Sequence, residues 1–442
     1  MSKTFVSSAK AVVVDATELE KPTLSQTYAT LRICLRYGES SANIFNRLIK
    51  VLETTDFIHI LSMMPDEELE RLMPMLAQRL TRLRLEMAEI PLLYSISRKM
   101  GVAELQQVRI CDVAQSKMKL NGSTSMCHLH LLGQLLPRLD MLNVHAAVVA
   151  SFPNNFRNLR ALLLRQGTSQ LVLDEICAHC PQLQRLFLRN ESSELLDASN
   201  ILKCSQLKEL QLPLMLRSPL AVCHLTHLEH LSLQRLQLWP GLDWLPIVRE
   251  IITAKRYELR SLRFDGSWLV TPLDLSLLQL KHCWALQEVL LSNCKLAEHT
   301  TQPELPLSCH RFGLRGCKLS WPLRYLKSNA QLQLLDFFDC QLAAGGYQLL
   351  QHLLKQRQCL PAVMPLQLRF SNSTPLRAEL TSWPASRRQH NEAWLKVMEV
   401  DDDVPTWKQP IGTISMTFGK PINYTPDLDL RSSTQAPVPA TR

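Results

Sequence analysis

Arginines recur at fixed places in this 442-residue chain, beside apolar residues spaced 20 to 34 positions apart. If each apolar residue marks a short strand, the residues one before, one after and three after it point to one side of that strand. Twelve arginines and no lysine occupy these positions: Arg32, Arg36, Arg82, Arg84, Arg109, Arg165, Arg185, Arg189, Arg263, Arg311, Arg315 and Arg369. A guanidinium presents a planar fork of N–H donors to a carboxylate or phosphate, so the row predicts a face that binds an acidic group.

This enrichment exceeds chance. Fourteen repeats supply 42 such positions, whereas 31 arginines in 442 residues would place about three there at random. The acidic residues at these positions are Glu86, Glu209, Asp265, Glu288 and Asp336. The predicted face therefore carries a charge of about +7, most of the formal net charge of +9. The alternative is ordinary solvation, in which long arginine stems cover apolar strands while their charged ends stay in water.

Cysteine and histidine clusters are the other candidates for chemistry. Cys177, His179 and Cys180 lie close together, but a structural zinc site needs four ligands and no second pair follows. The later histidines alternate with the leucines of one repeat and are interpreted as polar spacers: His224, His227 and His230. We therefore expect neither a metal site nor a cofactor.

Several function classes are excluded by motifs that the sequence lacks. The chain has only 13 glycines and contains no GxGxxG, GxxxxGK[ST] or GxSxG motif. We therefore expect no enzymatic activity and no catalytic residue. Its 13 cysteines are scattered and do not form a disulfide framework, which favours a reducing compartment. No apolar run approaches the ~18 residues of a membrane span, so we expect a cytoplasmic or nuclear protein without a membrane partner.

An internal repeat supplies the elements that would hold the arginines. Copies of L-x-x-L-x-L include CPQLQRLFL from Cys180, CSQLKELQL from Cys204 and CWALQEVLLSNC from Cys283. The middle apolar residue of each copy is its anchor: Ile33, Ile58, Leu83, Val108, Leu142, Leu162, Leu186, Leu210, Leu231, Leu262, Val289, Phe312, Leu335 and Leu366. This template resembles the leucine-rich repeat in its intracellular, cysteine-containing form, of the F-box/leucine-rich-repeat and ribonuclease-inhibitor-like type.

The resemblance implies an α/β fold, a leucine-rich-repeat solenoid shaped as a horseshoe. Parallel strands would line its concave side and helices its convex side, because no unit of ~25 residues can bury its apolar face alone. We expect a poorly defined N-terminal segment over 1–27, the solenoid over 28–370, a C-terminal cap over 371–400 and a tail over 401–442. The tail begins with three aspartates, and from about Pro426 its composition predicts disorder. One hypothesis is that these aspartates fold back onto the arginine face and compete with the partner.

Residues 28–79 have two interpretations. They continue the repeat rhythm as degenerate early repeats, and residues 44–61 are also similar to an F-box, with Leu52 and Asp56 at the L-x-x-x-D positions. In that family the F-box recruits a cullin-RING ligase through its adaptor, which Leu52 and Asp56 would contact here.

The function expected from these observations is non-enzymatic capture of an acidic or phosphorylated protein, with delivery to an SCF-type ubiquitin ligase as its most specific form. The alternatives are a scaffold or inhibitor without a ligase role, or a nucleic-acid-binding solenoid. The last is disfavoured because the face has few aromatics on which bases could stack.

Overall fold

The computed structural model describes most of the chain between residues 57 and 400. The described residues are 57–114, 122–145, 148, 151–188, 196–213, 216–234, 244–267, 269, 271–297, 305–319, 331–342, 349–359 and 364–400. They divide into two compact units, unit 1 up to Cys180 and unit 2 from Pro181. Several predicted features lie outside the described residues: Arg32, Arg36, Leu52, Asp56, Arg189 and residues 1–27 and 401–442.

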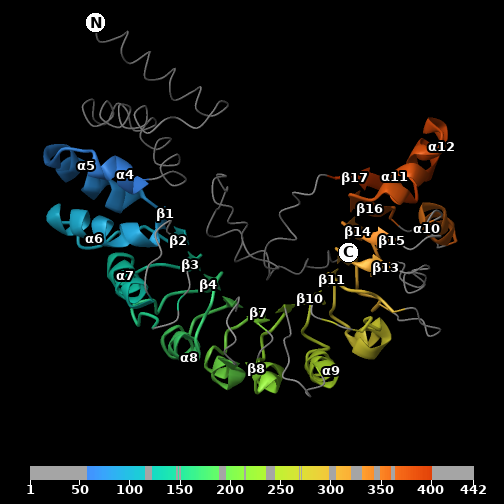
Figure 1. Cartoon of the computed structure of the whole chain (residues 1–442), viewed down its shortest axis with the longest axis horizontal. Helices are drawn as coiled ribbons and strands as arrows, with labels where there is room; N and C mark the ends of the chain where they lie inside the picture. The colour runs from blue at the N-terminus through green and yellow to red at the C-terminus, as the bar shows by residue number, and fades with distance from the viewer. Residues whose placement is uncertain are drawn as a thin grey trace, which may run out of the picture. The chain divides into compact units, whose positions relative to one another are not determined.

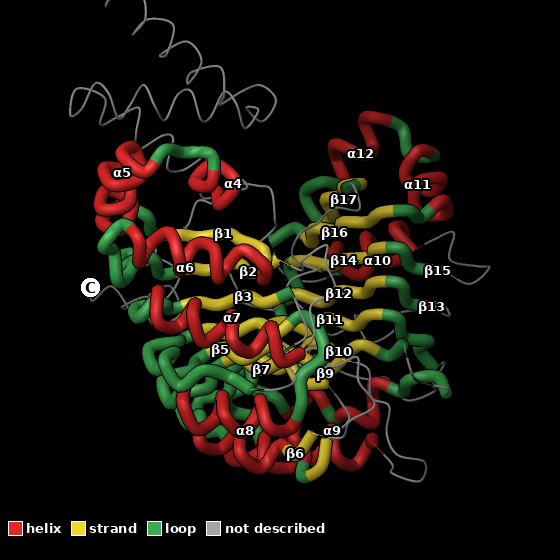
Figure 2. Tube along the Cα trace, turned by 60° about the vertical axis from the view of Figure 1, so that its left-hand side comes forward, coloured by secondary structure: helices red, strands yellow, loops and turns green. Residues whose placement is uncertain are grey.

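Unit 1 alternates strands with helices. Its helices are α4 (Phe57–Ser62), α5 (Asp66–Arg79), the 3-10 turn η2 (Met87–Glu89), α6 (Ile90–Lys99), α7 (Gly122–Leu135) and α8 (Gln170–His179). Its strands are β1 (Arg82–Glu86), β2 (Ile110–Ala114), β3 (Met141–Val144) and β4 (Ala161–Leu164). The four strands pair in parallel in chain order, and helices α6 to α8 lie along one side of them (Figure 1, Figure 2).

Unit 2 repeats this plan with shorter helices. Its long ladder consists of β5 (Arg185–Leu188), β7 (Glu209–Pro213), β9 (His230–Gln234), β10 (Ser261–Asp265), β11 (Glu288–Ser292), β12 (Arg311–Arg315), β14 (Leu334–Phe338), β16 (Leu366–Ser371) and β17 (Leu395–Glu399), all parallel. Two short ladders join β6 (Leu196–Asp197) to β8 (Leu216–Arg217) and β13 (Lys318–Leu319) to β15 (Gln341–Leu342).

Helical segments occupy several of the described connections of unit 2. They comprise the 3-10 turns η3 (Ala198–Lys203), η4 (Pro219–His224), η5 (Leu275–Leu278) and η6 (Leu280–His282), and the α-helices α9 (Trp244–Ala254), α10 (Leu349–Gln358), α11 (Thr374–Thr381) and α12 (Ala385–Asn391). Two of the 3-10 turns start on an aspartate whose carboxylate accepts a hydrogen bond from a backbone N–H two residues on, Asp197 and Asp274.

The leucine pattern explains the core. In β1, Leu83 and Leu85 are buried on the helix side, while Arg82 and Arg84 alternate with them on the other side. Successive side chains of a strand point to opposite faces, so the same alternation recurs in each ladder strand. The leucines of neighbouring repeats thus stack into one apolar layer. The predicted α/β class is confirmed, and the parallel ladder is the arrangement expected of an α/β repeat solenoid.

The ladder register confirms ten of the fourteen predicted anchors, because they lie opposite one another on paired strands: Leu83, Leu142, Leu162, Leu186, Leu210, Leu231, Leu262, Val289, Phe312 and Leu335. Ile33 lies outside the described residues. The other three anchors are wrong.

Each wrong anchor has a local reason. Val108 precedes β2, and Cys111 pairs with Leu83 instead, because the buried cysteine takes the place of the expected leucine. Leu368, and not Leu366, pairs with Leu335, because β16 holds inward leucines at both positions. Ile58 lies in the helix α4, where it is buried.

The ladder also continues beyond the sequence pattern, which stops at Phe370. Strand β17 pairs in parallel with β16, with Val397 opposite Leu368. Its sequence, LKVME, lacks the second leucine of the template, which is why the pattern did not reveal it.

Candidate functional site

The candidate site is the side of the strands opposite the helices, here called the outward face. In unit 1 we define it by Arg82, Arg84, Asp112, Asn143, His145, Leu163 and Arg165. In unit 2 we define it by Arg185, Glu209, His230, Ser232, Arg263, Glu288, Leu290, Arg311, Arg315, Asp336, Phe338, Arg369 and Val400.

Arg109 does not belong to this face, because the strand begins one residue later than the Val108 anchor predicted. The Arg109 guanidinium instead lies 3.6 Å from the Asp140 carboxylate, and its Nη1 donates to the Arg138 carbonyl. On β2 the residue opposite Arg84 is Asp112, an acidic outward side chain that the sequence analysis did not place there.

A buried amide organises the outward face of unit 1. The Asn143 side chain is fully buried, and its Nδ2 donates to Asp112 Oδ1 at 3.0 Å. The same Nδ2 lies 3.2 Å from His145 Nε2. Arg165 Nε donates to Asn143 Oδ1 at 3.1 Å. One amide therefore positions the carboxylate, the imidazole and a guanidinium on three neighbouring strands.

The electrostatics of this cluster show where the arginine charge gathers. The pKa of His145 is lowered to about 4, chiefly by burial and further by Arg165 and Arg84. Burial also raises the pKa of Asp112, against the lowering effects of its hydrogen bond from Asn143 and of nearby arginines. Arg84 from β1 and Arg165 beyond β4 thus act on the same imidazole, which is neutral at pH 7.

The positive charge in unit 1 exceeds the negative charge close to it. Arg82, Arg84 and Arg165 all lower the pKa of the Asp112 carboxylate, from which Arg82 Nη2 is 3.9 Å away. Glu86, the other acidic residue at a face position, caps the following 3-10 turn with its carboxylate. Among the residues that define the unit 1 face, arginines therefore outnumber carboxylates.

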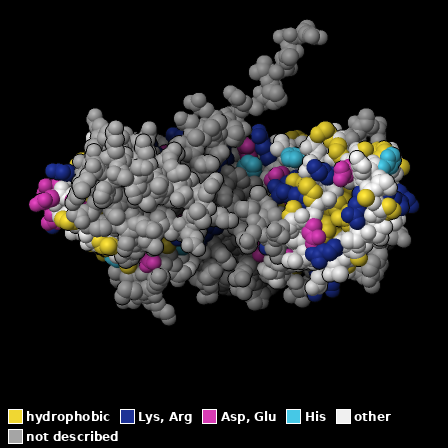
Figure 3. All heavy atoms as spheres, turned by 90° about the horizontal axis from the view of Figure 1, so that it is seen from above, with side chains coloured by type: hydrophobic (Ala, Val, Ile, Leu, Met, Phe, Trp, Pro, Cys, Tyr) yellow, Lys and Arg dark blue, Asp and Glu magenta, His cyan; other side chains and the backbone are white. Residues whose placement is uncertain are grey.

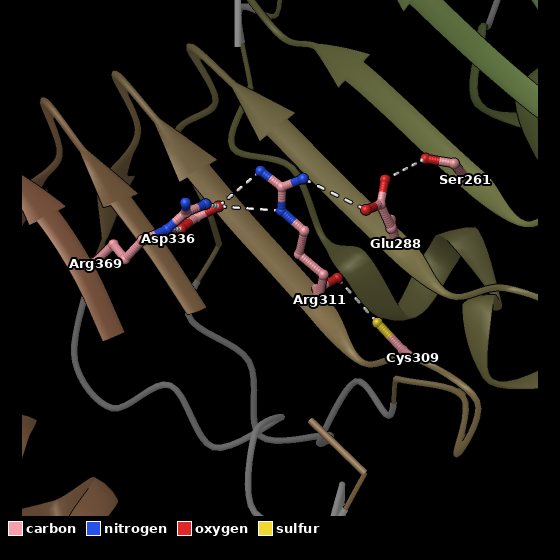
Figure 4. Close-up of polar contacts among 6 residues, drawn as sticks. All are labelled: Ser261, Glu288, Cys309, Arg311, Asp336 and Arg369. Atoms are coloured by element: carbon pink, nitrogen blue, oxygen red, sulfur yellow. Dashed lines mark hydrogen bonds and ion pairs between the residues drawn. The ribbon is translucent and has the colours of Figure 1, made fainter. Parts of the chain in front are cut away.

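The arginines of unit 2 are paired differently, because acidic side chains stand between them (Figure 4). Asp336, fully buried, accepts from Arg369 Nε at 2.7 Å and from Arg311 Nη2 at 3.0 Å. Arg311 Nη1 also lies 3.4 Å from Glu288 Oε1, and Ser261 Oγ donates to the other oxygen of that carboxylate at 3.1 Å. The chain of contacts joins five strands and is electrically neutral as a group.

The other arginines of the unit 2 outward face also lie near acidic side chains. Arg315 Nη2 lies 3.8 Å from Asp339, and Arg185 Nε lies 3.4 Å from Glu209. Burial raises the pKa of Glu209 to about 8, outweighing the opposite effects of Arg185 and Arg263. Burial likewise lowers the pKa of Arg263 to about 10.

The predicted face charge of about +7 included Arg32, Arg36 and Arg189, which lie outside the described residues, and Arg109, which lies off the face. Asp112 replaces Arg109, and the acidic residues in unit 2 pair directly with arginines on adjacent strands. In the view of Figure 3, basic, acidic and apolar side chains are likewise interleaved over the described surface. Among the residues that define the faces, three arginines stand against one carboxylate in unit 1 and five against three acidic side chains in unit 2.

The cysteine cluster has a packing role. Cys177 and Cys180 are buried at the end of α8, and Cys180 Sγ donates to the Phe156 carbonyl at 3.5 Å. Among the described residues, no group of three or more histidine, cysteine or acidic side chains is placed to hold a metal ion. No helix in the described part of the chain is both long and apolar enough to cross a membrane.

Comparison with protein-family models gives no match to this chain, and comparison with curated proteins gives none either.

Proposed function

We propose that this chain is a non-enzymatic recognition protein whose outward face binds an acidic or phosphorylated protein segment, and that Arg84 and Arg165 make the main anionic contact. The observation that carries the proposal is the cluster in which the Asn143 amide contacts Asp112, His145 and Arg165, with Arg84 close enough to lower the pKa of His145 further. An anion placed there would meet N–H donors already held by Asn143. Arginine is well suited to this role because its fork matches carboxylate and phosphate oxygens.

The test is a titration with peptides of defined charge. A phosphoserine peptide, its glutamate counterpart and its serine counterpart are titrated into the full chain and into the double variant Arg84→Glu, Arg165→Glu. We expect about 100-fold weaker binding of the anionic peptides to the variant, which corresponds to about 2.7 kcal/mol. Arg157→Glu is the matched control, because Arg157 is exposed in the loop before β4 and lies off the outward face.

Equal affinity in the double variant and the control would contradict the proposal. Arg185 is a poor position for this test although the sequence analysis places it on the face. Its guanidinium also lies beside the buried Glu209, so charge reversal there would bring two buried acids together.

The more specific form of the proposal is a leucine-rich-repeat horseshoe that serves as substrate receptor of an SCF-type ubiquitin ligase in the cytoplasm or nucleus. It rests on the resemblance of the repeats and of residues 44–61, where Leu52 and Asp56 would contact the adaptor. Its simpler counterpart is a scaffold or inhibitor that occupies the same partner without a ligase.

Deleting residues 1–79 separates these two forms. If Leu52 and Asp56 belong to an F-box, affinity purification of the full chain from cell lysate should recover cullin and its adaptor, whereas the deleted chain should lose both. Recovery of the same acidic partner by both chains, without cullin, would favour the scaffold. The double substitution Leu52→Ala, Asp56→Ala tests the same point with the whole chain present.

A further inference from the structure

The outward face of unit 2 contains apolar side chains that are as buried as the core. Leu290 on β11 and Phe338 on β14 are each 1% exposed, although both point away from the helices. They pack together, and Val400 packs against them. Val400 follows β17, and its backbone N–H donates to the Phe370 carbonyl at 2.9 Å. The described chain therefore ends on the outward face, against this apolar patch.

Charged side chains border the patch at the point where the chain continues. The Arg369 guanidinium carbon lies 6.0 Å from the centroid of the Phe338 ring. Arg369 and Arg311 share the carboxylate of Asp336, and Arg311 also contacts Glu288, so two guanidiniums and two carboxylates lie together there. The three residues after Val400 are Asp401, Asp402 and Asp403. Their carboxylates are of the kind that the N–H groups of Arg369 and Arg311 already bind in Asp336 and Glu288.

Farther along the same face, several polar atoms are buried without a partner. Glu209 Oε1, His230 Nδ1 and Ser232 Oγ have no hydrogen-bond partner among the described residues. Glu209 lies opposite His230 on paired strands, and Ser232 lies two residues along β9. Buried polar groups are usually satisfied. An extended peptide lying across these strands would offer N–H and C=O groups to them.

The length of chain after Val400 suits this path. Six strand steps separate β17 from β9, a distance of roughly 29 Å at ~4.8 Å per step. About nine extended residues span that distance at ~3.3 Å per residue. We propose that residues 401–410 dock across the outward face of unit 2, with the aspartates beside Arg311 and Arg369 and the following residues over β12 to β9.

The docked segment makes the unit 2 face an internal binding surface for an acidic peptide of this same chain. The proposed contact does not involve Arg84 and Arg165, which belong to unit 1.

Trypsin provides the probe, because the segment contains the cleavable bond Lys408–Gln409 and the tail contains a second, Arg431–Ser432, outside the proposed contact. A synthetic peptide of residues 401–442 gives the intrinsic rates at both bonds.

In the full chain, we expect cleavage after Lys408 to be at least ten-fold slower than in the free peptide, with cleavage after Arg431 at the peptide's rate. The triple variant Asp401→Asn, Asp402→Asn, Asp403→Asn should remove most of this protection without touching the described fold. The double variant Leu290→Glu, Phe338→Glu should remove it as well. The exposed control Arg157→Glu should leave it unchanged.

Cleavage after Lys408 at the peptide's rate in the full chain would overturn the proposal and leave the face to an external partner. Protection that persists in the triple variant would overturn the role of the aspartates. Loss of protection with Arg157→Glu as well would show that the effect is not specific to the proposed contact, and would overturn the proposal. The triple variant changes only residues 401–403, which follow the described strands. The test therefore holds even if the Leu290→Glu, Phe338→Glu variant misfolds.

Discussion

Replacing Asp336 by asparagine is expected to lower the free energy of unfolding by about 3–5 kcal/mol, because removing one partner of a buried ion pair leaves the others uncompensated. The Asp336 carboxylate is fully buried and accepts from two guanidiniums, those of Arg311 and Arg369. The amide keeps the shape of the side chain but loses its charge. Its NH₂ group would also point a donor at one of the two guanidiniums.

The measurement is urea unfolding of the variant beside the wild-type chain. Asp339→Asn is the matched control, because the Asp339 carboxylate is a third exposed and its single arginine contact is 3.8 Å long. Asparagine also tolerates the positive φ of 53° that Asp339 adopts. We expect the control to change stability by less than about 1 kcal/mol. A similar small effect for both substitutions would show that the chain of ion pairs in unit 2 contributes little.

Glu209→Gln is expected to make the protein more stable than wild type above pH 8. The pKa of Glu209 is raised to about 8 by burial, from an ordinary value of 4.5. Between these values the folded chain keeps a proton that the unfolded chain releases. Protonation of Glu209 therefore stabilises the folded chain fully below about pH 4.5, and this stabilisation is lost as the pH rises toward 8. Glutamine resembles the protonated acid and does not titrate.

Unfolding in urea at pH 5 and pH 8 measures this directly. We expect the wild type to lose about 3 kcal/mol more than the variant over this interval. Groups common to both proteins contribute equally to the two pH profiles and drop out of the difference. One of them is His145, whose lowered pKa makes stability rise with pH over this interval. Parallel pH profiles for the two proteins would mean that Glu209 ionises in the folded state at its ordinary pKa.

The fold was predictable because apolar alternation is a local property. An inward residue at every second position specifies a strand, and its recurrence specifies stacking, so ten anchors fall in register. The failures are local as well. In β2 the sequence ICDVA puts cysteine where leucine was expected, and the preceding Val108 preserved the apparent 25-residue rhythm.

The charge of the face was not predictable by summing residues along the chain. Asp336 and Glu288 were correctly placed on the face, but their effect depends on which arginine the ladder sets beside each. Arg311 and Asp336 are 25 residues apart in sequence and become neighbours only through the register of β12 and β14. Comparing the charged residues of each repeat with those of the next one would have predicted this contact.

The roles of Asn143 and His145 were harder to predict from the sequence than those of the arginines. Neither residue carries a charge at neutral pH, so a count of basic and acidic residues passes over both. Their importance comes from burial beside Arg165 and Asp112, which depends on three strands coming together. The sequence places Asn143 on the outward side of its strand, and no motif marks it as the organiser of the cluster.

Capture of partners from cell lysate tests the binding role of Arg84 and Arg165 most directly. The full chain, the double variant Arg84→Glu, Arg165→Glu and the control Arg157→Glu are used as baits, with untreated and phosphatase-treated lysate. We predict that the full chain and the control recover the same acidic or phosphorylated proteins, and that the double variant recovers none of them. Phosphatase treatment should remove the phosphorylated ones. Identical recovery by all three baits would contradict a binding role for these arginines.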